Sequence, residues 1–139
     1  MVTGKLAVIT LDTSAIFTLL NRKDKDYSRV FAALQATRPP FYIPTGILAE
    51  IGYMVEEKLG QAALLALLQD IQNQNFILAP SELDIPRATA LVDRYDDLPL
   101  GLADSLVIAC AERHGGNVLT LDGDFWIVAK EGTLQVFPL

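Results

Sequence analysis

The chain has 139 residues, of which 51% are hydrophobic and 20% are charged, and its formal net charge is −6 at pH 7. This length and composition suit a single domain over residues 1–139 with a substantial buried core, and they argue against disorder. The net acidity argues against a protein that holds nucleic acid by bulk electrostatics alone, but it does not exclude an enzyme that acts on nucleic acid.

Neither a membrane span nor a disulfide framework is expected. The longest apolar runs, such as residues 62–68, fall well short of the roughly 20 residues that cross a bilayer. Residues 1–9 lead into a strand and lack a signal-peptide cleavage pattern, which predicts a cytoplasmic protein. The single Cys110 lies in an apolar segment, where we interpret it as a small core residue, and no thiolate metal site is possible.

Hydrophobic patterning predicts alternating strands and helices through the first half of the chain. The expected elements, in chain order, are a strand at 5–11, a helix capped by Thr13 or Ser14 and running to about Leu20, a helix that begins at Asp24 or Asp26 and ends before Arg38, a strand at 41–43, a helix opened by Pro44 and Thr45, a helix at 61–73 and a strand at 76–78.

The second half continues the alternation. The expected elements are a helix capped by Ser81, in a capping-box-like pattern with Asp84, and running to about Arg94, a helix over 100–111 that is stopped by Gly115 and Gly116, a strand at 118–121 that ends at Asp122, and a last strand at 134–137. Strands that alternate with helices predict an α/β protein: a three-layer α/β/α fold around a central, mainly parallel sheet.

Two acidic residues stand out because their helical surroundings are apolar. Asp104 lies in the run Leu100–Ala111, and Glu50 lies in the run Ile47–Met54; neither has a basic residue on its own helix face. Neither acid resembles a solvated surface charge. Burying an unpaired carboxylate costs several kcal/mol, so a shared positive partner is expected, and a divalent metal is the simplest one.

Two further acids are placed to join them. Asp12 and Asp122 each follow a predicted strand, and parallel strands end at one edge of a sheet, where ligands of such folds bind. We therefore expect Asp12, Glu50, Asp104 and Asp122 to converge on one rim. Each acid also has a simpler interpretation: Asp12 could cap the helix that follows it, and Asp104 could be a first-turn acid favoured by the helix dipole. These accounts serve each residue separately and do not explain the joint pattern.

Taken in order, four segments resemble the PIN-domain nucleases, and most closely the small single-domain VapC toxins of toxin–antitoxin pairs. The segments are Asp12-Thr13-Ser14 after a strand, Thr45–Tyr53 with Glu50, Leu98–Ala109 with Asp104, and Val118–Phe125 with Asp122. Each motif alone is weak, whereas their order and spacing across the chain are specific.

The resemblance implies a PIN-like α/β/α fold, a Mg²⁺- or Mn²⁺-dependent endoribonuclease with RNA as its substrate, and a small antitoxin as its partner. Asp12, Glu50 and Asp104 match the family's three central acids, and Asp122 matches the more variable fourth. Thr13 or Ser14 would be the polar neighbour of the first acid. The stretch between Asp122 and Phe125 is a residue shorter than in many relatives, so Asp124 could share or replace the fourth role.

This chemistry suits the residues. Oxygen ligands without His or Cys favour Mg²⁺ or Mn²⁺ over zinc, and a metal held by carboxylates can activate water for attack on a phosphodiester. The alternatives are a PIN nuclease that processes RNA outside a toxin pair and a non-cleaving PIN module used for binding. A haloacid dehalogenase type of phosphatase is disfavoured, because it needs a second Asp two residues after Asp12, where the chain has Ser14.

A few remaining features bear on partners. The apolar helix at 61–73, with Leu64, Leu65, Leu67, Leu68 and Ile71, offers more hydrophobic surface than a small sheet needs, which predicts a homodimer or a partner interface. The basic group Arg22, Lys23, Lys25 and Arg29 could contact RNA or be a solvated surface. Trp126 is expected to pack or to contact a partner, and His114 to favour a helix C-terminus.

Overall fold

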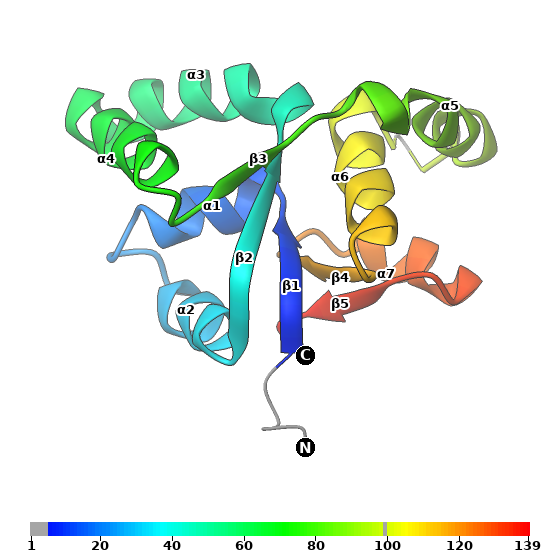
Figure 1. Ribbon diagram of the computed structural model, residues 1–139, viewed down its shortest axis with the longest axis horizontal. Coiled ribbons are helices and arrows are strands. Elements are labelled where there is room, and N and C mark those ends of the chain that lie inside the picture. The colour runs from blue at the N-terminus through cyan, green and yellow to red at the C-terminus, as the bar shows by residue number, and fades with distance from the viewer. Residues whose placement is uncertain (1–5, 99) are drawn as a thin grey trace.

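A five-stranded parallel sheet forms the centre of the computed structural model, which describes residues 6–98 and 100–139 (Figure 1). The strands, in the spatial order β3-β2-β1-β4-β5, are β1 (Leu6–Leu11), β2 (Thr37–Pro44), β3 (Ile77–Ala79), β4 (Asn117–Leu119) and β5 (Gln135–Phe137). Every paired neighbour is parallel. The predicted α/β architecture is confirmed, and the sheet over the described residues is parallel throughout.

Helices cover both faces of the sheet (Figure 1). One layer contains α1 (Thr13–Leu19), α2 (Tyr27–Gln35), α3 (Leu48–Leu59) and α4 (Gln61–Gln72), and the other contains α5 (Ile85–Arg94), α6 (Leu102–Arg113) and α7 (Asp124–Val128). The strands are apolar because both their faces are covered: Ile9, Leu11, Ile43, Val118 and Leu119 are fully buried. None of the helices in these described ranges is long and apolar enough to span a membrane.

The direction of winding reverses at the centre of the sheet. After β1 the chain enters α1 on one face, whereas after β4 it enters α7 on the other, and β1 and β4 are neighbours. The two strand ends meet directly, because the Asp12 backbone N–H donates a 3.2 Å hydrogen bond to the Leu119 carbonyl. Such a reversal leaves a crevice beyond the carboxyl ends of the two strands, and this is where ligands of open α/β sheets bind.

Strand β2 is longer than the sequence predicted. The expected strand at 41–43 extends over Thr37–Pro44, even though Pro39 and Pro40 cannot donate hydrogen bonds to a neighbour. The prolines are tolerated for two reasons. Strand β3 pairs only with Tyr42 to Pro44, so the proline segment lies beyond its end, and on the other side the register with β1 shifts between Ala7 and Ile9.

Two helix starts differ from the predicted ones. Asp12, and not Thr13 or Ser14, caps α1: its side chain accepts a hydrogen bond from the Ala15 backbone N–H. The capping box predicted at Ser81 and Asp84 is also wrong. A short 3₁₀ turn, Glu82–Asp84, precedes α5, and the Asp84 carboxylate pairs with Arg113 instead of closing a box.

The C-terminal region turns earlier than predicted. The strand expected at 118–121 is confirmed as β4, but it ends at Leu119, so Asp122 lies three residues past the strand in a loop and does not end it. The sequence pattern also gave no indication of α7 or of the 3₁₀ turn Ala129–Glu131 that follows it. The last strand is confirmed as β5. Helix α6 ends at Arg113, just before Gly115 and Gly116, which adopt positive φ angles of 103° and 88°.

Candidate active site

A pocket of ≈ 330 Å³ opens at the carboxyl ends of β1 and β4, between α1, α3 and α6. All four acids predicted from the sequence line it, although they come from four separate elements. Its lining comprises Asp12, Thr13, Ser14, Phe17, Thr18, Glu50, Met54, Lys58, Asp104 and Asp122. The convergence expected from parallel-strand geometry therefore occurs.

Asp12 is the most fully enclosed of the acids, with only 4% of its surface exposed. Its carboxylate accepts hydrogen bonds from the Ala15 backbone N–H at 2.9 Å, from the Ser14 hydroxyl at 2.7 Å and from the Thr120 hydroxyl. Burial raises the pKa of Asp12, and these hydrogen bonds oppose that rise. Asp12 thus caps α1 and also presents a fixed carboxylate to the pocket, so the cap and the candidate ligand are one residue.

Asp104 lies in the first turn of α6 and also lines the pocket. Burial raises the pKa of Asp104 to about 6, and repulsion from Asp122, Asp12, Glu50 and Asp124 adds to the rise. Within residues 6–98 and 100–139 no basic side chain forms an ion pair with Asp104. Asp104 therefore lies among other acids without an ion-pair partner of its own in these ranges.

Glu50 differs from the prediction that it would be shielded from solvent. It lies in the first turn of α3 and is exposed, because the helix starts at the rim and turns this residue outward over the pocket. The Thr13 hydroxyl donates a 3.1 Å hydrogen bond to its Oε1 atom, which ties the start of α1 to the start of α3. Thr13 therefore orients Glu50, while Ser14 orients Asp12.

The fourth acid sits in a loop held by hydroxyl groups. The Asp122 backbone N–H donates to Thr120 Oγ1 at 2.9 Å, and Thr120 in turn donates to Asp12. Asp122 lines the pocket and accepts a 2.9 Å hydrogen bond from the Asp124 backbone N–H through Oδ1. Asp124 begins α7 and is not among the residues that line the pocket.

Sequence reasoning missed two groups that hold these acids in place. Thr120 was detectable as a polar residue in an otherwise apolar strand segment. Ser81, at the end of β3, accepts a 2.9 Å hydrogen bond from the Gly46 backbone N–H just before α3. A Cβ atom on Gly46 would lie 2.5 Å from Leu106 Cδ1, so this glycine allows the Glu50 segment to approach the helix that carries Asp104.

The donor set fits a hard divalent cation. Four carboxylates and several hydroxyl oxygens line one pocket, where burial and then mutual repulsion raise the pKa of Asp104. Across residues 6–98 and 100–139, no three acidic, His or Cys side chains are gathered closely enough to hold one ion as they stand. Ligation would therefore require the carboxylates to rotate toward a common point.

Two other residue groups singled out from the sequence lie elsewhere. Arg22, Lys23, Lys25 and Arg29 do not line the pocket, and Arg29 pairs with Asp26 at 3.6 Å. His114 is the C-cap residue of α6, as predicted. Instead, the cation that lines the pocket is Lys58, which the sequence gave no reason to single out.

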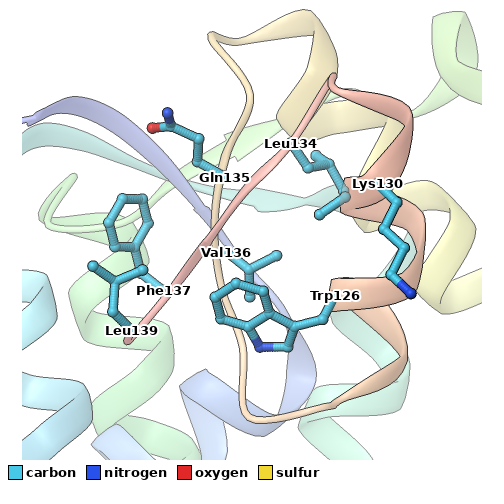
Figure 2. A pocket seen from close by; sticks show the side chains of 8 residues that line it. Trp126, Lys130, Leu134, Gln135, Val136, Phe137 and Leu139 are labelled. Carbon is cyan, nitrogen blue, oxygen red and sulfur yellow. The ribbon is translucent and has the colours of Figure 1, made fainter.

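The larger hollow on the molecule is apolar and lies apart from the acids. This second pocket, ≈ 580 Å³, lies between α7 and the edge strand β5 (Figure 2). Trp126, Leu134, Val136 and Phe137 form most of its wall, and no acidic residue lines it. Size alone would have favoured this apolar pocket as the active site, whereas the four acids line the smaller pocket.

Comparisons with known proteins agree with this geometry. The PIN domain family profile matches residues 9–131. Ribonuclease VapC26 of Mycobacterium tuberculosis is 27% identical over 114 residues, which are 81% of this chain and 84% of that protein. The crystal structure of VapC20 from M. tuberculosis, a sarcin-ricin loop cleaving toxin, superimposes with a TM-score of 0.76 at 20% identity, over 86% of this chain and 94% of that one. A toxin–antitoxin complex from Klebsiella pneumoniae gives a TM-score of 0.62 at 23% identity, over 84% of this chain and 89% of that one.

Proposed function

The chain belongs to the PIN domain family, and from that premise we propose that it is a metal-dependent endoribonuclease, the toxin of a toxin–antitoxin pair. The single observation that carries the proposal is the convergence of Asp12, Glu50, Asp104 and Asp122 on one pocket. Similarity to a ribonuclease of the VapC type supports RNA as the substrate.

In this proposal each carboxylate has a role that follows from its position in the pocket. Asp12 and Asp104 are the principal metal ligands, because both line the pocket from the starts of α1 and α6 and are close enough to repel each other. Glu50 is exposed and held by Thr13, which suits a ligand or a residue that orients the attacking water. Asp122, in its loop, supports the metal ligands. Ser14 and Thr120 keep Asp12 in a fixed orientation.

The expected ion is Mg²⁺ or Mn²⁺, since the donors are all oxygen atoms. When bound, such an ion lowers the pKa of water and neutralises the charge that develops on the phosphate during hydrolysis. The protein's own part is to hold the carboxylates ionised around that position. Asp104, with its pKa raised to about 6, is ionised near neutral pH and becomes protonated in mild acid.

We also propose a small antitoxin as the partner, a homodimer as the assembly and the cytoplasm as the location. The toxin–antitoxin complex among the structural neighbours supports the first. On α4, Leu65 is 51% exposed while Leu67 on the same helix is fully buried, so apolar surface remains for a second chain. A basic side chain of the antitoxin, placed among the four acids, would inhibit by replacing the metal's charge.

The test is cleavage of a mixed RNA pool with mapping of the new 5′ ends. We expect the wild type to cleave with Mg²⁺ or Mn²⁺ and to stop when a chelator is added. Asp12→Asn and Asp104→Asn should each lower the rate by roughly 10³-fold or more, because each removes a charged ligand with almost no change in volume. Full activity in either purified variant would refute the site.

A further inference from the structure

The pocket that holds the acids has a second, chemically different end. Lys58 and Met54 on α3, together with Phe17 on α1, line the part of the pocket that follows these two helices away from their N-termini. Glu50, Met54 and Lys58 are spaced four residues apart, so they lie along one face of α3. One continuous wall therefore runs from carboxylate through apolar side chains to an ammonium group.

The spacing places Lys58 well away from the carboxylates. Eight residues of helix span about 12 Å, so the backbone of Lys58 lies that far from the backbone of Glu50. Within the described ranges, Lys58 forms no ion pair with any acid of the pocket or of a neighbouring element. Its charge is therefore not neutralised internally, and it is exposed to whatever fills the pocket.

Resting on the proposed function, we infer that Lys58 forms a phosphate subsite for single-stranded RNA, and that this subsite binds a phosphate next along the strand and not the one that is cleaved. Phe17 and Met54 line the interval between the two phosphates and contact the face of an unpaired base there. A single strand fits this wall because its bases are free to contact apolar side chains, whereas paired bases are not.

Charge makes such a subsite necessary. The chain carries a net charge of −6, and four of its acids line this pocket, so an RNA strand meets a repulsive field. A divalent ion offsets that repulsion only at the carboxylate end. The neighbouring phosphate needs a cation of its own, and the basic group at Arg22, Lys23, Lys25 and Arg29 does not line the pocket.

Lys58 also lies in the last turn of α3, where a cation interacts favourably with the helix dipole. That structural role and the subsite predict different results. Loss of a dipole interaction alone would lower thermal stability and leave RNA binding unchanged. Loss of a phosphate contact would weaken RNA binding and reduce its dependence on salt, with little effect on the melting temperature.

The experiment compares Lys58→Gln, Lys58→Arg and a matched control, Lys130→Gln, which removes the same charge at the apolar pocket beside β5. We expect Lys58→Gln to raise KM for a short RNA roughly five- to tenfold with kcat nearly unchanged, and to make the salt slope of log(kcat/KM) shallower by about 0.7. Lys58→Arg should recover most of the loss, and Lys130→Gln should match the wild type.

A scan of the RNA locates the subsite. Each phosphate near the cleavage position is replaced in turn by a neutral methylphosphonate. Wild-type protein should lose affinity at one phosphate that is not cleaved, and Lys58→Gln should be insensitive at that same position. Identical profiles for the two proteins would overturn the inference even if both cleave RNA. If the wild type cleaves no RNA, the proposed function fails separately, and fluorescence anisotropy of the same oligonucleotides in Mg²⁺ still decides the subsite: equal affinities would overturn it.

Discussion

The two ends of helix α6 differ in whether their charged side chains have ion-pair partners. Near its C-terminus, Glu112 accepts two hydrogen bonds from Arg87, at 2.8 and 2.9 Å, and Arg113 donates two to Asp84, at 2.9 and 3.0 Å. At its N-terminus, Asp104 has no such partner in the described part of the chain, and other acids surround it. The same helix therefore has ion-paired side chains at its C-terminal end and, among the described residues, an acid without an ion-pair partner at its N-terminal end.

This contrast shows that the fold can supply counter-charges where a charge only supports structure. Asp84 is almost fully buried, yet it keeps an arginine partner. The acids of the pocket have no such partner in residues 6–98 and 100–139. Burial, and then repulsion from the other acids, raises the pKa of Asp104. Carboxylates gathered without ion-pair partners indicate a site that is completed by a cation from outside the chain.

Breaking an ion pair at the C-terminal end of α6 should have the largest effect on stability. Arg113→Met removes the cation from Asp84, whose side chain is only 4% exposed, and leaves a buried carboxylate without its partner. We expect the free energy of unfolding to fall by about 2–3 kcal/mol, because an uncompensated buried charge costs more than the pair gains. Urea denaturation measures this.

Arg94→Met is the matched control for that experiment. Arg94 is 64% exposed and lies 3.6 Å from Glu131, so its loss should cost about 0.5 kcal/mol or less. Equal losses in the two variants would mean that burial of Asp84 does not decide the cost. Metal-dependent RNA cleavage should persist in both proteins below their unfolding transitions.

The sequence predicted most of the architecture because apolar runs reveal buried strands directly. Residues 5–11 and 134–137 are short and apolar, and both became parallel strands close to the expected ranges. The pattern failed where tertiary contacts decide the outcome. Pro39 and Pro40 argued against a strand, but β2 accommodates them where β3 has already ended. Similarly, Ser81 resembled a helix cap, but its hydroxyl accepts a hydrogen bond from the Gly46 backbone N–H, just past the end of the neighbouring strand β2.

For the site, too, local sequence patterns predicted some features, and tertiary contacts decided the others. The positions of Asp12 and Asp104 followed from strand ends and helix starts, which local patterns reveal. The exposure of Glu50 and the place of Lys58 depend on how α3 is rotated against α1, and no local pattern specifies that rotation. Thr120 stood out as a polar residue in an apolar segment, but its partner Asp12 could not be predicted, because that contact depends on β1 and β4 being neighbours in space.

A second prediction separates the two candidates for the fourth acid. Asp122→Ala should lower RNA cleavage about 10- to 100-fold, since Asp122 lines the pocket and supports the ligands. Asp124→Ala should have a smaller effect, because only its backbone N–H contacts Asp122 and that group survives the substitution. Steady-state rates at saturating Mn²⁺ provide the measurement. A more damaging Asp124→Ala would move the fourth role to the start of α7.

The smallest expected effect is on the stability of the metal-free protein when Asp104, at the N-terminal end of α6, is neutralised. Asp104→Asn should stabilise the metal-free protein above pH 6 by about 1 kcal/mol, because it removes a charge that burial and the neighbouring acids both disfavour, and solvent screens part of this effect. The pKa of Asp104 is about 6 in the folded chain against an ordinary 3.8, so folding favours the protonated form. As the pH rises from 4 to 6, the wild type should therefore lose stability relative to the variant.

Below pH 4 the two proteins should unfold alike, because protonated Asp and Asn are both neutral. Thermal unfolding in a chelator, measured from pH 4 to 8, follows this difference, with Asp93→Asn on the exposed face of α5 as a control that should show none of it. Adding Mn²⁺ should reverse the order at pH 7, since the ion stabilises the wild type and binds the variant weakly. A difference that stays constant across the whole pH range would show that the repulsion around Asp104 is too weak to mark a metal site.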